Sequence, residues 1–172
     1  MINRKTDPEE VKKLYASIDS QNLTDEEQYK YLTQHDADIV KYKERVFNIV
    51  KQKGLGSYMN DSKWLQLQKE IIKLDFSPPY LEKLVTDNEF RYANVDTNNV
   101  SFFGDWAPFY KGGMPLFFDI EYLMIIPRRK EYVGKQVNDK TLDISEKLKE
   151  ILTKINIPFE TNCNNFIVYG YK

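Results

Sequence analysis

The sequence predicts an α+β fold, in which N-terminal helices precede a mainly antiparallel sheet. Apolar residues recur at helical spacing through the first third of the chain, whereas strand-like alternation and tight turns gather in residues 101–129. A further helical pattern and a pair of strand candidates complete the C-terminal part. At 172 residues, the chain can form one domain with a sizeable core and an added piece. We therefore expect an N-terminal helical segment over residues 1–53 and an α+β core domain over residues 54–172.

Three helices are expected in the N-terminal segment. Asp7, followed by a proline and two acids, supplies a capping oxygen and a rigid first turn. Thr24 and Glu27 have the spacing of a capping box. The third helix runs from about Asp36 to Lys53 and ends at Gly54, which can adopt the left-handed conformation of a C-terminal cap.

A fourth helix opens the core domain at Asn60–Ser62 and carries an apolar stripe that should face the sheet. The prolines Pro78 and Pro79 end this helical region, because proline lacks an amide donor. The strand candidates that follow are Tyr80–Val85, Glu89–Val95 and Val100–Phe103.

The central strand is expected over Leu116–Ile126, after a tight turn at two glycines. Counted by twos, one face carries Phe118, Ile120, Tyr122, Met124 and Ile126, and we expect this face to be structural. The other face is acidic and then apolar, so we expect a strand that is half to fully buried, with one polar window.

The C-terminal part begins with Arg128–Lys140, a charged stretch that we expect to be a loop. Asp143 and the residues after it then open a helix with cap-and-acid spacing. Ile157–Thr161 and Asn165–Tyr171 should form a hairpin over an Asn-rich turn.

Composition narrows the classes of function. Lys and Arg number 25 against 26 Asp and Glu, so the surplus of positive charge that a nucleic-acid or membrane-surface binder needs is missing. The N-terminus lacks the apolar stretch of a secretion signal, and no run approaches the roughly 20 apolar residues of a spanning helix. The single cysteine suggests a reducing compartment. These features favour a cytoplasmic protein.

Few residues offer familiar catalytic chemistry. His35 is the only histidine and lies in a polar helix junction, and Cys163 lies in a polar turn with no evident activating base. The common motifs for nucleotides, hydrolases and zinc are missing from the sequence. We expect no cofactor.

The acids of the central region are the strongest candidates for a site. Asp119 and Glu121 should share one strand face about 7 Å apart, and the preceding turn could bring Asp105 close to them. Three carboxylates could hold a divalent metal or act as an acid–base pair. The alternative is that Asp119 and Glu121 mark the solvated end of a strand or pair with nearby arginines.

Aromatic residues surround the same turn. Trp106, Phe109 and Tyr110 follow Asp105, and aromatic side chains beside acids are typical of protein-contact surfaces. They could equally fold back onto the core. Both interpretations stay open at the level of sequence.

Several segments also carry a family resemblance. They are Asp61-Ser62-Lys63-Trp64, Gly104-Asp105-Trp106, Ile120-Glu121-Tyr122-Leu123, Ile126-Pro127-Arg128, Ile157-Pro158-Phe159 and Phe166-Ile167-Val168-Tyr169-Gly170-Tyr171. Over about residues 45–172 the chain resembles the bacterial domain of unknown function 6678 family, which implies no established activity. The stretch from Trp106 to Asp119 is similar to the turn-and-strand centre of the SMI1/KNR4-type immunity proteins.

Two functions from different classes follow. The first is a protein-binding module, specifically an immunity protein that neutralises a bacterial toxin, since acidic and aromatic side chains suit a partner with a cationic cleft. The second is a metal-assisted hydrolase that uses Asp105, Asp119 and Glu121, with Arg128 holding an anionic substrate. The predicted binding residues are Asp105, Trp106, Phe109, Asp119, Glu121 and Arg128. A housekeeping protein without a toxin partner fits the same residues.

Overall fold

The computed structural model describes residues 2, 4–98, 100, 102–131 and 140–172, and the α+β prediction is confirmed. The chain divides into two compact units, Met1–Gly54 and Leu55–Lys172. In the described residues, the first unit holds three α-helices, and the second holds two α-helices and a four-stranded antiparallel sheet. The division into a helical segment over residues 1–53 and a core domain over residues 54–172 stays a prediction.

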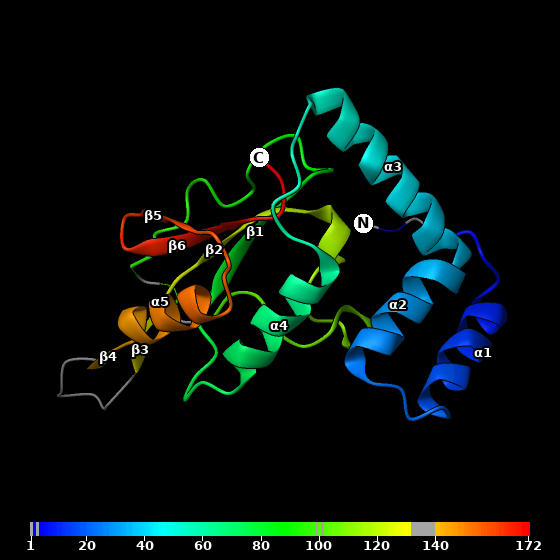
Figure 1. Cartoon of the computed structure of the whole chain (residues 1–172), viewed down its shortest axis with the longest axis horizontal. Coiled ribbons are helices and arrows are strands. Elements are labelled where there is room, and N and C mark those ends of the chain that lie inside the picture. The colour runs from blue at the N-terminus through cyan, green and yellow to red at the C-terminus, as the bar shows by residue number, and fades with distance from the viewer. Residues whose placement is uncertain (1, 3, 99, 101, 132–139) are drawn as a thin grey trace. The chain divides into compact units, whose positions relative to one another are not determined.

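The helices of the first unit begin and end close to where the sequence places them (Figure 1). They are α1 (Pro8–Asp19), α2 (Asp25–His35) and α3 (Ala37–Lys53). The Asp7 side chain accepts the first free amide of α1, and Thr24 with Glu27 forms the predicted capping box of α2. Gly54 caps α3 with φ of 66°.

Two buried acids tie the N-terminal residues to the start of α3. Asp36 caps this helix and also accepts a 2.6 Å hydrogen bond from the Arg4 guanidinium. Asp38 accepts the backbone amides of Lys5 and Thr6 at 3.1 and 3.0 Å, and these donors hold the pKa of Asp38 below its ordinary value. Charge-assisted hydrogen bonds therefore hold residues 4–6 against the start of α3.

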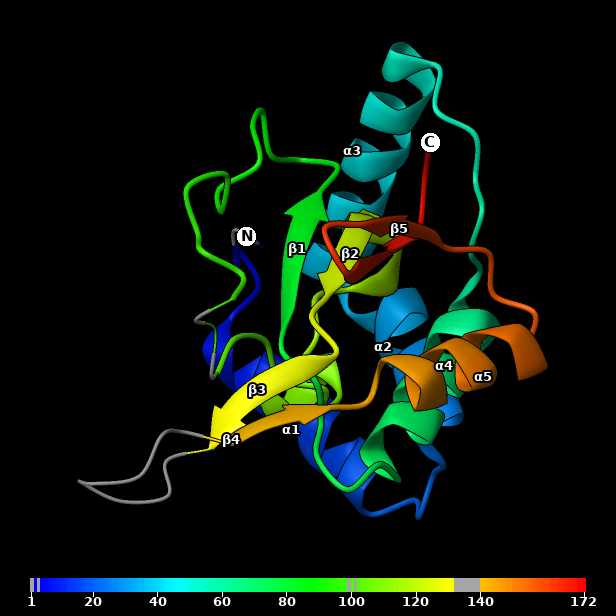
Figure 2. The same cartoon turned by 90° about the vertical axis from the view of Figure 1, so that its left-hand side faces the viewer.

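The sheet of the second unit has the order β1-β2-β6-β5 with antiparallel neighbours. Its strands are β1 (Tyr80–Leu84), β2 (Ile120–Ile125), β5 (Glu160–Asn162) and β6 (Asn165–Tyr169). Helices α4 (Asp61–Ile72) and α5 (Ser145–Lys154) lie side by side next to it (Figures 1 and 2). Trp64 of α4 stacks on Phe117 with ring centroids 6.3 Å apart, so the helix contributes to the core as its stripe predicted.

The central strand differs from its prediction in start and in faces. A 3-10 turn, η2 (Phe117–Asp119), precedes β2 and breaks the two-residue alternation. Leu123 and Ile125, on the acidic-then-apolar face, are fully buried, which agrees with a strand that is half to fully buried, whereas Tyr122 and Met124, on the face expected to be structural, are only half-buried. Both faces of β2 are covered by other parts of the chain, so apolar alternation could not separate them.

Two predicted strands are turns and irregular backbone. The described residues of Glu89–Val95 and Val100–Phe103 join no strand pairing; residue 101 lies outside the described part. Phe90, Tyr92 and Val95 pack instead against a buried cluster of Leu81, Val100 and Ile126. The segment that holds these residues lies beside β1 (Figure 2). Its apolar residues are spaced like those of a strand because they are buried against the sheet.

The stretch Arg128–Lys140 was predicted as a loop, and this is wrong at both ends. Strand β3 (Arg128–Glu131) pairs antiparallel with β4 (Lys140–Asp143), while residues 132–139 lie outside the described part. This two-stranded ribbon is largely exposed, so its charged residues show no apolar alternation from which to predict strands.

The C-terminal hairpin is confirmed. Asn162 pairs with Asn165, and the two residues between them, Cys163 and Asn164, have positive φ angles of 48° and 61°. Positive φ at both central positions is typical of the tight turn that matches the twist of paired strands. Beyond β6, Lys172 and Gly56 exchange backbone hydrogen bonds of 2.8 and 3.0 Å, which ties the two ends of the second unit together.

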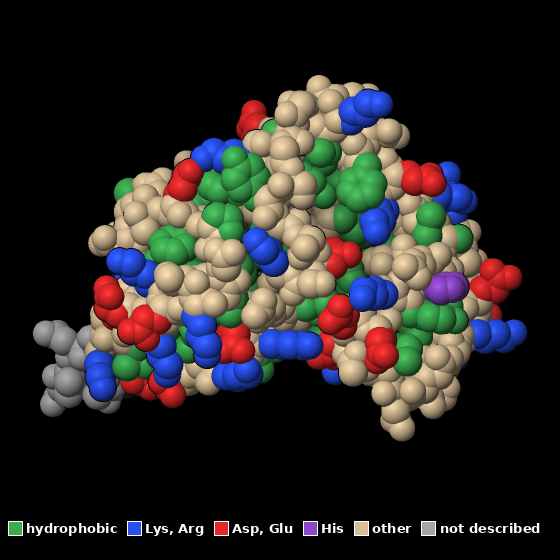
Figure 3. Space-filling view, viewed as in Figure 1, with side chains coloured by type: hydrophobic (Ala, Val, Ile, Leu, Met, Phe, Trp, Pro, Cys, Tyr) green, Lys and Arg blue, Asp and Glu red, His purple; other side chains and the backbone are tan. Residues whose placement is uncertain are grey.

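The mixed charge of the surface reflects the near balance of basic and acidic residues in the sequence. Lys and Arg side chains are interleaved with Asp and Glu on the face shown in Figure 3. Among the described residues, no helix combines the length and the apolar character needed to cross a membrane.

Candidate interaction site

A groove with a volume of about 510 Å³ lies where α4 ends and β1 begins. We call it the aromatic groove. The residues that line it are Ile72, Ser77, Pro79, Phe102–Ala107 and Arg129. They belong to the end of α4, to the segment before β1, to residues 102–107 and to β3.

Tyr80 fixes the segment that forms one wall of the groove. Its hydroxyl donates to the carbonyl of Asp105 at 2.9 Å and accepts the amide of the same residue at 3.3 Å. Its own backbone amide donates to the carbonyl of Phe103 at 3.0 Å. Burial raises the pKa of the Tyr80 phenol, so the hydroxyl keeps its proton and continues to donate.

Gly104 allows the close approach of this segment to Tyr80. Its φ is +72°, and a Cβ at this position would lie 2.5 Å from the Cε1 atom of the Tyr80 ring. Only glycine combines the left-handed backbone with such a contact at low cost. The wall is therefore held in one conformation by the buried ring.

Trp106 belongs to the core. It is 3% exposed, and its indole nitrogen donates to the carbonyl of Pro78 at 2.7 Å. Its own carbonyl accepts a 2.7 Å hydrogen bond from Gln68 of α4, and its ring meets Tyr80 edge-on at 4.9 Å. Of the two interpretations left open by the sequence, the core interpretation holds for this residue, which leaves little of its ring for a partner.

The exposed apolar side chains of the groove were missed in the sequence. Phe102 is 82% exposed, Ile72 is 55% exposed and Phe103 is 38% exposed. Phe102 and Phe103 fall in the predicted strand Val100–Phe103, and in a strand one of two adjacent side chains must point away from the core. That pair of neighbouring phenylalanines was the signal that could have identified them.

Two residues of opposite charge, Asp105 and Arg129, line the groove together with these apolar residues. One oxygen of Asp105 accepts the amide of Ala107 at 2.8 Å, and the carboxylate is exposed. The Arg129 guanidinium lies 4.7 Å from the centre of the Phe76 ring and is half-buried. Within the described ranges, neither Asp105 nor Arg129 forms an ion pair.

The three predicted carboxylates do not meet. Asp105 bonds to Tyr80 at the start of β1, whereas the Asp119 carboxylate accepts from the amide and hydroxyl of Thr86, just beyond the end of that strand. The first and last residues of this five-residue strand lie about 13 Å apart at roughly 3.3 Å per residue. Among the described residues, no cluster of three His, Cys, Asp or Glu side chains could hold a metal ion.

The other two acids have structural partners. Asp119 is 2% exposed, since it belongs to the 3-10 turn and not to an alternating strand. Glu121 lies 3.6 Å from the ammonium of Lys83 on the neighbouring strand β1. Glu121 is therefore ion-paired, as the alternative expected, but its partner is Lys83 and not one of the predicted arginines, and burial removes Asp119 from any contact surface.

Phe109 lies in η1 (Phe109–Lys111), a short 3-10 turn. It is half-buried, and its ring meets that of Tyr110 edge-on at 5.7 Å. It does not line the aromatic groove. Its role in binding stays a prediction.

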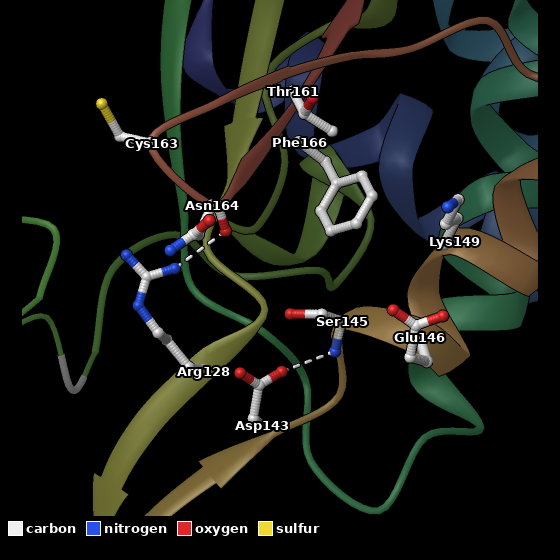
Figure 4. A pocket seen from close by; sticks show the side chains of 9 residues that line it. All are labelled: Arg128, Asp143, Ser145, Glu146, Lys149, Thr161, Cys163, Asn164 and Phe166. Atoms are coloured by element: carbon white, nitrogen blue, oxygen red, sulfur yellow. Dashed lines mark hydrogen bonds between the residues drawn. The ribbon is translucent and has the colours of Figure 1, made fainter.

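Arg128 lies in a second hollow, of about 540 Å³, between the C-terminal hairpin and the start of α5 (Figure 4). Its guanidinium donates to the carbonyl of Asn164 at 2.8 Å and to the side chains of Asn165 and Asn98 at 3.1 and 3.3 Å. Through these three acceptors, Arg128 links the hairpin turn to the segment between β1 and η1 that contains Asn98. The structure does not bring it to the predicted acids.

The charges of this second hollow are mixed. Asp143 accepts the amide of Ser145 at 2.7 Å, and the hydrogen bonds from Ser145, with Arg128 nearby, hold its pKa below the ordinary value. Glu146 and Lys149 lie on the opposite side, and the thiol of Cys163 turns away from the other side chains in Figure 4. The aromatic groove has the larger exposed apolar surface of the two.

Comparisons with known proteins identify a family and give no activity. A family model described as a family of unknown function, DUF6678, matches residues 46–172. No curated protein and no solved structure matches the chain. The match covers the second unit, including both hollows.

Proposed function

Because this chain belongs to the DUF6678 family, whose description assigns no activity, we propose its function from the aromatic groove: the protein is a binding module that holds a partner protein at this surface. The proposal keeps the class of function expected from the sequence and changes the residues that would carry it. Asp105 is retained, and Phe102, Phe103 and Ile72 replace the buried Trp106 and Asp119.

One observation carries the proposal. Five large hydrophobic side chains are exposed among the described residues, and three of them line this single groove. Isolated exposed apolar residues are common in monomeric proteins, whereas a group of them marks an interaction surface. Aromatic side chains are also enriched among the residues that dominate binding energy at protein interfaces.

The toxin-neutralising role is the specific form of this proposal. An immunity protein needs one surface that covers part of its toxin, and the groove supplies exposed apolar side chains together with one carboxylate and one guanidinium. Such a partner would be met in the cytoplasm, which the single cysteine favours.

The test is co-expression with the product of the neighbouring gene in a growth assay. If that product is toxic, the wild-type protein should restore growth, and Phe102→Asp should abolish the rescue because it places a charge in the apolar contact. Tyr58→Asp is the matched control, since Tyr58 is 47% exposed and lies outside the groove. Rescue by Phe102→Asp equal to that by wild type would rule out the groove as the contact surface.

A neighbouring product that is harmless alone, or toxicity that the wild-type protein does not relieve, would remove the toxin-neutralising form. The metal-assisted hydrolase receives no support from the geometry, because Asp105 is held at the start of β1 whereas Asp119 and Glu121 lie near its end.

A further inference from the structure

The aromatic groove carries a protruding side chain and a hollow on the same surface. Phe102 is 82% exposed, while Pro79 and Gly104 lie in the wall of the hollow and present little side-chain bulk. A ring that projects beside a hollow of about 510 Å³ offers both halves of one contact. Such a surface can be complementary to a copy of itself.

The charges of the groove are complementary in the same way. The surface offers one carboxylate, Asp105, and one guanidinium, Arg129, and neither is ion-paired within the described part of its own chain. A partner that satisfies both must present one cation and one anion around an apolar centre. A second copy of this surface presents that set.

We infer that the occupant of the aromatic groove is a second copy of this chain, related to the first by a two-fold axis. The inference rests on the proposed function, that the groove holds a partner protein, and it names a second copy in place of a toxin as that partner. Each Phe102 enters the hollow of the other copy, and each Asp105 faces the other copy's Arg129. A two-fold contact closes on itself, so the assembly stops at a dimer.

The apolar contact is tested by sedimentation velocity on the full chain. The wild-type protein should form a dimer at concentrations up to about 1 mM, at which even a dimer with a Kd of ~1 mM would be detected. Phe102→Asp should be monomeric throughout, and Tyr58→Asp should dimerise like wild type. A wild-type protein that stays monomeric at the highest concentration overturns the inference.

Charge reversal tests the two-fold geometry. Asp105→Arg and Arg129→Asp should each weaken the dimer by about 100-fold or more, because each places like charges opposite one another twice. An equimolar mixture of the two variants should form a heterodimer, since both of its charge pairs are again opposite in sign. The double variant should regain the homodimer. A dimer that survives both single reversals, or a mixture that stays monomeric, contradicts the arrangement.

These results separate this inference from the proposed function. If the protein is monomeric but loses toxin neutralisation with Phe102→Asp, the groove binds a different protein and only the second-copy inference fails. Far-ultraviolet circular dichroism of each variant shows whether the fold is retained. If Phe102→Asp unfolds the chain, the charge-reversal mixture still decides the question.

Discussion

Gly104→Ala is the most informative single change, because it tests how the groove wall is held. A methyl group at this position would lie 2.5 to 2.6 Å from three atoms of the Tyr80 ring. The ring cannot easily move away, since Tyr80 is 2% exposed and meets Trp106 edge-on at 4.9 Å. Alanine would also have to adopt φ of +72°.

A second glycine separates these two costs. Gly112 has φ of +80°, and a Cβ there would have nothing within 4 Å. Gly112→Ala should therefore show only the backbone cost of about 1–2 kcal/mol. Gly104→Ala should add about 1–3 kcal/mol for the forced contact, so its total loss of unfolding free energy should be about 2–5 kcal/mol.

The assay is urea unfolding followed by tryptophan fluorescence. Both tryptophans, Trp64 and Trp106, belong to the second unit, so the signal reports the unit that holds the groove. Equal losses for the two alanine variants would show that Tyr80 does not confine the wall, and the account of the groove geometry would be wrong.

Three further predictions concern the same unit. Trp106→Phe should lower the free energy of unfolding by about 1–3 kcal/mol in urea, because the buried Pro78 carbonyl loses its indole donor; a loss below about 0.5 kcal/mol would contradict that role. Burial raises the pKa of the Tyr171 phenol to about 12, so the unfolded chain loses this proton first and stability falls as pH rises from about 10 toward 12. The free energy of unfolding of Tyr171→Phe, measured in urea at a series of pH values, should fall less steeply between about pH 10 and 12 than that of the wild type. An unchanged slope would exclude the phenol as the source of this pH dependence. Residues 55–172 alone should unfold cooperatively with a native-like near-ultraviolet circular dichroism spectrum; a fragment without that spectrum would show that the second unit depends on residues 1–54.

Local signals in the sequence predicted the helices well. Caps at Asp7, Thr24 and Asn60 depend on side chains within three residues of the helix start, so the sequence contains the information that the structure uses. The C-terminal hairpin followed from its Asn-rich turn for the same reason. The central strand and its extensive burial were predicted, but the deeper burial of Leu123 and Ile125 than of Tyr122 and Met124 was not, because tertiary packing covers both sides.

The candidate site was predicted less well, since it depends on contacts distant in sequence. The burial of Trp106 depends on its hydrogen bonds with Gln68 and Pro78, which lie 38 and 28 residues away in the sequence. Asp119 was placed on a strand face by counting, and a 3-10 turn changes that count. Asp105 was the one predicted contact residue that lines the aromatic groove with its carboxylate exposed.

The most direct test of the central claim is photo-crosslinking inside the cell from position 102. A photoreactive phenylalanine analogue replaces Phe102 in one sample and Tyr58 in the control. The account predicts a protein adduct from position 102 that is missing from position 58. Its mass should be about twice the 20.4 kDa of the chain for a second copy, and mass spectrometry should identify any other partner. The absence of a protein adduct from position 102 would contradict the claim that this groove is an interaction surface.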